Sequence, residues 1–146
     1  MQFMGIDFQK LLLTVDGRIG RQTFWIGFAA LIVAGMLNGL IIGSISLILA
    51  TLVSLALAVP AYCVSIKRSN DRGHPQMFVQ GFFIASIAFQ VLTLTGIFGF
   101  LGYFIAGLFG LVIGAAAIWL LIDLGALEGT KGANAYGPDP LETVQA

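Results

Sequence analysis

The sequence is poor in the residues on which disulfides, metal centres and soluble surfaces depend. It has one cysteine and one histidine, which excludes a disulfide within the chain and a metal site built from several such ligands. Charged residues make up only 10% of the 146 residues, whereas a soluble domain carries about a quarter. A chain this short cannot bury 58% hydrophobic residues in one soluble core. The composition therefore predicts a membrane protein.

What the sequence does contain is two long uncharged stretches, 24–66 and 73–122. As one helix the first would span about 65 Å at 1.5 Å per residue, but a hydrocarbon core is only about 30 Å thick. Each stretch must therefore fold back, and small and polar residues mark the turns near Gly43 and Gly99. We expect an all-α membrane protein, one domain over 1–146, with four transmembrane helices as two hairpins at 24–42, 46–66, 77–95 and 101–122.

The charges predict the orientation of these hairpins. Two hairpins gather all seven Lys and Arg residues on one side of the membrane, which the positive-inside bias identifies as the cytoplasm. Both termini are then cytoplasmic. Residues 1–23 show three- and four-residue apolar spacings that favour a short interfacial helix. In the tail, 123–146, Pro138 and Pro140 prevent a continuing helix and favour an ordered cytoplasmic loop.

Three short motifs lie in these charged regions and resemble a known family. The motifs are Gly17-Arg18-Ile19-Gly20-Arg21 followed by Phe24-Trp25, then Lys67-Arg68-Ser69-Asn70-Asp71-Arg72-Gly73, and then 129–140, which reads Gly-Thr-Lys-Gly-Ala-Asn-Ala-Tyr-Gly-Pro-Asp-Pro. The chain is similar to the bacterial inner-membrane family catalogued as domain of unknown function 805, the YhaH-like proteins. In the middle motif Asn70 stands where family members usually have histidine. The resemblance implies a bacterial inner (plasma) membrane location and no established chemistry.

All three motifs are expected at the cytoplasmic surface, so we predict a polar cluster there. Arginine binds carboxylate or phosphate in a bidentate manner, and in one interpretation four arginines pair with four aspartates of the same chain. In the other, each arginine anchors the topology and contacts lipid phosphate. The predicted cluster comprises Asp16, Arg18, Arg21, Trp25, Lys67, Arg68, Asp71, Arg72, Asp123, Asn134, Tyr136 and Asp139.

Small residues recur at helical spacing within two of the predicted spans. They are Gly35, Gly39 and Gly43 in the first, and Gly102, Ala106, Gly110 and Gly114 in the fourth. Such stripes allow helix backbones to approach closely. They indicate either packing within the chain or contact between copies.

Nothing in the sequence indicates catalysis: we expect no catalytic residues, no cofactor and no metal. The interpretation we favour is a non-enzymatic scaffold or accessory protein with a charged cytoplasmic face. The alternatives are a small oligomeric transporter or channel, and an anionic-lipid-binding or envelope-stress protein. Expected partners are anionic headgroups, further copies of the chain or another membrane protein. A net charge of zero gives no indication of nucleic acid.

Overall fold

The computed structural model describes residues 2–3, 6–95 and 100–141, and most of these are helical. The elements are β1 (Gln2–Phe3), β2 (Ile6–Asp7), α1 (Phe8–Leu13), α2 (Arg21–Leu37), η1 (Asn38–Ile42), α3 (Gly43–Ile45), α4 (Leu47–Arg72), α5 (Met77–Leu94) and α6 (Phe100–Gly125). The two short strands pair antiparallel, and η1 is a π-helix that continues α2.

Four helices are long and apolar enough to cross a membrane: Arg21–Ile45, Leu47–Arg72, Met77–Leu94 and Phe104–Gly125. Their surfaces carry many exposed apolar side chains, such as Leu40 and Leu111, which are 71% and 72% exposed. Hydrocarbon can cover such surfaces and water cannot. The predicted helical fold with four apolar helices is thereby confirmed.

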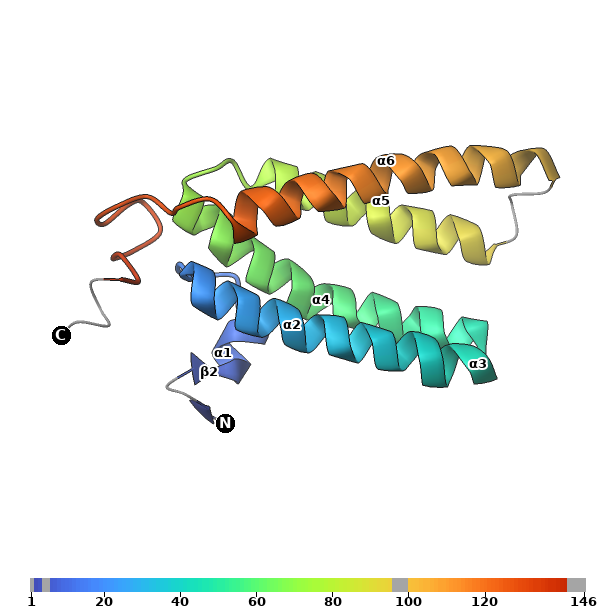
Figure 1. Ribbon diagram of the computed structural model, residues 1–146, viewed down its shortest axis with the longest axis horizontal. Helices are drawn as coiled ribbons and strands as arrows, with labels where there is room; N and C mark the ends of the chain where they lie inside the picture. Colours follow the sequence, from blue (N-terminus) through green and yellow to red (C-terminus); the bar gives the residue numbers. More distant parts are fainter. Residues whose placement is uncertain (1, 4–5, 96–99, 142–146) are drawn as a thin grey trace.

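The helices are arranged so that the charged segments meet at one end. Figure 1 shows α2 beside α4 and α5 beside α6, with the N-terminal segment, the end of α4 and the C-terminal tail at the left. The expected turn at Gly96 and Gly99 lies outside the described residues, as do residues 142–146 of the tail.

The helices run further at this end than the predicted spans. The first begins at Arg21, and α4 extends past residue 66 to Arg72, so the middle motif is helical although we expected it in a loop. The helix ends only at Gly73, whose left-handed conformation (φ 69°) allows its N–H to donate to the Asn70 carbonyl at 3.2 Å. The helix can continue through these charges because each one finds a partner on a neighbouring element. Asp123 likewise lies in α6, which ends at Gly125.

At the opposite end, a side-chain bond holds α2 and α4 together. The chain reverses at Ser46, which is extended and whose hydroxyl caps α4 by accepting from the Leu49 N–H at 3.3 Å. Asn38, which falls within the first predicted helix, is helical and buried. Its Nδ2 donates to the Ala50 carbonyl and to the Ser54 hydroxyl, both at 2.9 Å.

Among the described residues, the cluster of buried apolar side chains lies near the charged end. It includes Leu11, Phe24, Val64, Ile66, Val79, Leu120 and Leu124. Gly27 of α2 packs closely against two of them: a Cβ added to it would lie 3.3 Å from Leu11 and from Val64. The stripe glycines Gly35, Gly39 and Gly114 instead face open space within this chain, so the expectation of packing inside the chain is wrong for those three.

Candidate functional site

Asp71, in the last turn of α4, is the centre of a buried ionic network. Arg18 reaches its Oδ1 with two donors, Nη2 at 3.0 Å and Nε at 3.1 Å. The Nη1 group of Arg68, one turn earlier in α4, binds Oδ2. Both arginine side chains are 1% exposed and the carboxylate is 5% exposed. One buried carboxylate is therefore shared by two buried guanidinium groups.

Two further ion pairs surround this centre. Arg72 donates from Nη2 to Oδ1 of Asp123 at 2.9 Å, with both side chains largely buried. Arg21 pairs with Glu128 at 3.4 Å, but these side chains are 47% and 72% exposed. From the sequence we expected only aspartates as partners, and Glu128 was missed. Glu128 follows the fourth predicted helix, whose end lies near Arg21, and this position could have indicated the pair.

Several other arginine donors bind carbonyl groups at the end of α6 or just after it. The last four carbonyls of a helix lack partners within it and carry partial negative charge. Arg68 donates to the Leu124 carbonyl at 2.7 Å and to the Leu127 carbonyl at 2.6 Å. Three more donors bind nearby carbonyls: Trp25 Nε1 at Gly125, Arg21 Nη1 at Ala126 and Arg72 Nη1 at Glu128. These side chains therefore act as the C-terminal cap of α6.

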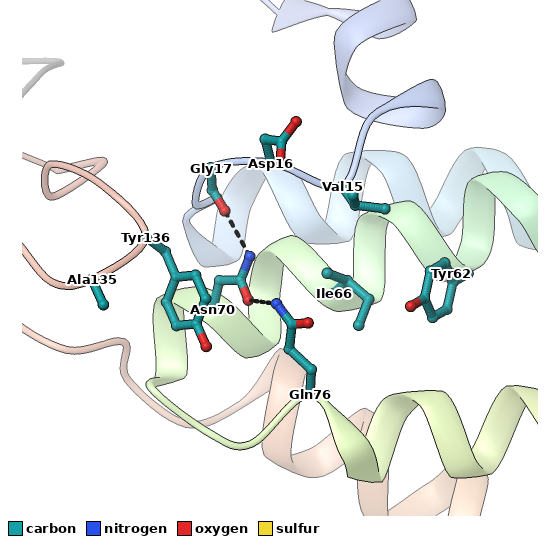
Figure 2. Close-up of a pocket in the computed structure, with 9 residues that line it drawn as sticks. All are labelled: Val15, Asp16, Gly17, Tyr62, Ile66, Asn70, Gln76, Ala135 and Tyr136. Carbon is teal, nitrogen blue, oxygen red and sulfur yellow. Dashed lines mark hydrogen bonds between the residues drawn. The ribbon is translucent and has the colours of Figure 1, made fainter.

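Lys67 plays the same part for the short helix α1. Its side chain is buried, and its Nζ donates to the carbonyl of Lys10 and, at 3.0 Å, to that of Leu11. The neighbouring Asn70 is also buried and joins two more segments. Its Nδ2 donates to the Gly17 carbonyl at 3.1 Å, and its Oδ1 accepts from Gln76 at 2.7 Å (Figure 2).

The C-terminal tail lies across the Asp71 site. Thr130 donates its N–H to the Asp71 backbone carbonyl at 2.8 Å, and Arg18 donates to the carbonyls of Thr130 at 2.6 Å and Gly132 at 2.7 Å. Gly129 rests directly against the Asp71 carboxylate, where an added Cβ would overlap it. A glycine is therefore required for the tail to cross Asp71 at this distance.

Beyond this crossing the tail forms a tight turn. Asn134 and Gly137 exchange two backbone hydrogen bonds of 3.0 and 3.1 Å, and the Asn134 side chain accepts from the Tyr136 N–H. Asp139 accepts from the N–H groups of Leu141 and Gly132, both at 2.9 Å, and these bonds lower the pKa of its carboxyl below the ordinary value. The described part of the tail is thus an ordered loop.

The predicted cluster is therefore brought together, with two departures from the expected pairing. Asp16 is exposed, and no ion pair involves it among the described residues. Asp139 bonds to backbone amides in the contacts given above, and Tyr136 is exposed at 40%. In the described part of the chain, no group of three or more His, Cys, Asp or Glu side chains could hold a metal ion.

Four apolar helices and a polar end define a multi-pass helical membrane protein. The chain belongs to the family described as "Protein of unknown function (DUF805)", which matches residues 12–138, and the resemblance inferred from the three motifs is confirmed. It is 33% identical over 141 residues to "Uncharacterized protein YiiR" of Escherichia coli strain K12, covering 90% of this chain and 88% of that one. The protein of the same name from Escherichia coli O157:H7 matches equally. No solved structure matches the chain.

Proposed function

We propose that the chain resides in the bacterial inner membrane as two transmembrane hairpins, with both termini in the cytoplasm. All seven Lys and Arg residues belong to α1, the loop after it, the start of α2, the end of α4 or the tail. These segments lie at one end in Figure 1. Positive-inside bias favours the cytoplasm for that end. A reporter inserted at Ser46 should be accessible only from the far side, whereas access from the cytosol would exclude this topology.

We further propose that this end is a non-enzymatic scaffold surface, which we call the polar cap. It consists of residues 16–25, 67–76 and 123–141. The observation that supports this role is the Asp71 network, which ties these three remote segments to one buried carboxylate. Its charged donors are directed at groups of the same chain. A surface held rigid in this way is suited to binding a partner protein, whereas catalysis would need charged groups that are free to contact a substrate.

Site-specific photocrosslinking in native membranes tests the scaffold proposal. A photoreactive residue at Leu141, which is 71% exposed on the tail, should capture a discrete partner. Asp71→Asn, which loosens the cap, should reduce that capture by an order of magnitude, while Glu128→Gln at the exposed pair should leave it unchanged. Equally strong capture in Asp71→Asn would mean that the partner does not require the folded cap, and it would refute the scaffold proposal.

A second candidate, binding of anionic lipid, is favoured by the exposed cations at the same end. Lys10 is exposed on α1 and the Arg21 side chain is 47% exposed. Each basic side chain near an anionic surface contributes about 1 kcal/mol. Replacing both by glutamine should reduce copurifying phosphatidylglycerol. The buried Arg68 is the control position for these two exposed residues, because its donors bind carbonyls and a carboxylate of the chain. Unchanged lipid in the Lys10 and Arg21 double variant would exclude this candidate.

A further inference from the structure

A polar cavity of about 400 Å³ lies beside the Asp71 network, between the loop after α1, the end of α4 and the tail. Asp16, Asn70, Gln76 and Tyr136 line it on the side of the polar cap, and Tyr62 lines its inner end. In Figure 2 the Tyr62 hydroxyl is on the side of its ring that faces Ile66 and Gln76, and Asp16 lies next to Gly17, on the side away from Gln76.

An apolar cavity of about 420 Å³ lies next to this polar one and shares the Tyr62 side chain with it. It runs between α4 and α5 and is lined mainly by aliphatic and aromatic side chains, among them Leu55, Val59, Phe83 and Ile87. Tyr62 lines both cavities. Its ring packs edge-on against Phe83, with the ring centres 5.5 Å apart, which fixes the hydroxyl at the boundary. Together the two cavities form a site with one apolar and one polar end.

Polar atoms at this boundary are available to a ligand. Within residues 6–95 and 100–141, no hydrogen bond involves the Tyr62 hydroxyl or the Gln76 side-chain oxygen, although both side chains are partly buried. Neither atom is occupied by these described residues, so each is free to bind a ligand that enters the cavities. Ester and glycerol oxygens can accept from the tyrosine, and a glycerol or ammonium group can donate to the glutamine.

Charge at the rim indicates the kind of headgroup. Of the residues that the structure describes, Asp16 is the only charged one that lines the polar cavity. An adjoining cavity of about 520 Å³ shares Asp16 and Tyr136 with it and is also lined by the charged residues Asp7, Lys10, Arg18 and Lys67. Arg18 and Lys67 donate to the Asp71 carboxylate and to carbonyls of the chain, so the carboxylates of Asp7 and Asp16 and the Lys10 ammonium group remain for a ligand. Groups of both signs match a zwitterionic headgroup, and a net-anionic headgroup would meet the two carboxylates unfavourably.

We propose that the two neighbouring cavities together bind one zwitterionic phospholipid. An acyl chain lies in the cavity between α4 and α5, the ester region meets Tyr62 and Gln76, and the cationic end of the headgroup reaches Asp16. The proposal rests on the membrane embedding proposed above, and it does not depend on the scaffold role.

The test is native mass spectrometry of the full chain, released from micelles that contain equal amounts of phosphatidylethanolamine and phosphatidylglycerol. We expect the first phosphatidylethanolamine adduct to exceed the phosphatidylglycerol adduct about threefold, the scale of one exposed ion pair. Asp16→Asn should bring the ratio near one. Equal adducts for the wild type, or an excess of phosphatidylglycerol, would overturn the proposal.

Two matched pairs of variants separate the site from the general lipid-facing surface. Tyr62→Phe keeps the ring and removes the hydroxyl, so it should weaken adduct retention severalfold. Its control, Thr93→Val, removes a hydroxyl that binds its own helix at Phe89. Val59→Trp should fill the apolar cavity and abolish the adduct, whereas Leu111→Trp, at a position 72% exposed on α6, should not. Equal effects within either pair would refute the site, while an unchanged reporter result at Ser46 would leave the proposed topology standing.

Discussion

Replacing Asp71 by asparagine tests whether the buried network holds the polar cap together. The substitution keeps the shape of the side chain and removes the charge that Arg18 and Arg68 share. An asparagine can still accept from one guanidinium group, but its NH₂ group then faces the other, since neither arginine can lose its proton. Two buried cations are left without a compensating charge.

The expected cost follows from the burial of the three side chains. Removing one partner of a buried ion pair destabilises a protein by about 3–5 kcal/mol, and here both cations are 1% exposed. A typical native protein is stable by only about 5–15 kcal/mol. Asp71→Asn should therefore remove a large share of the stability and free the tail from α4.

The assay is unfolding in mixed micelles by titration with sodium dodecyl sulfate, together with limited proteolysis of the tail. The control is Glu128→Gln, which breaks the exposed pair with Arg21 and should cost only about 0–1 kcal/mol. The double variant Arg18→Gln with Asp71→Asn should lose less free energy of unfolding than the two single variants lose together, because the two side chains interact directly. If Asp71→Asn cost no more than Glu128→Gln, the reasoning from burial would be refuted.

Three further predictions concern other parts of the chain. Gly129→Ala should destabilise the protein by about 1–3 kcal/mol in the same titration, because the added methyl group displaces the Asp71 carboxylate; an unchanged titration curve would contradict the close crossing. Asn38→Leu should cost about 0.6 kcal/mol and at most about 1.7, typical of a hydrogen bond between membrane helices, with Thr93→Val as the neutral control. Since the folded state lowers the pKa of Asp139, its contribution is present above about pH 3.9 and is lost as the pH falls through the lowered value. The protection of the Gly132 amide against exchange, relative to an unfolded peptide at the same pH, should therefore fall in acid, and Asp139→Asn should show no such step.

The number of helices could be predicted because it depends on properties of single segments. An uncharged stretch such as 24–66 must fold back whatever surrounds it, since the thickness of the bilayer limits its length. The family resemblance could likewise be found from short motifs, because glycine and arginine residues at fixed spacing can be recognised in the sequence alone. Neither inference requires knowledge of which segments touch.

The extension of α4 to Arg72 could not be predicted in this way. Consecutive charged residues after an apolar span suggest a solvated loop. Helix propensity alone does not distinguish such a loop from a continuing helix. What stabilises the helix there is the set of partners that each charge finds, such as the α6 carbonyls for Arg68 and the α1 carbonyls for Lys67. The partners of Arg68 and Lys67 named here are backbone groups, which every residue has, so no pattern in the sequence identifies them.

This difference explains why so much of the specific structure lies at one end. In a bilayer the lipid is as apolar as the helix surfaces, so apolar burial gives little drive for the helices to associate. Exposed residues such as Leu40 and Leu111 accordingly contribute length and hydropathy but little tertiary contact. Polar groups must then determine which helices pair. Asn38 does so for α2 and α4 at one end, and Asp71 joins α4 to the first loop and to the tail at the other.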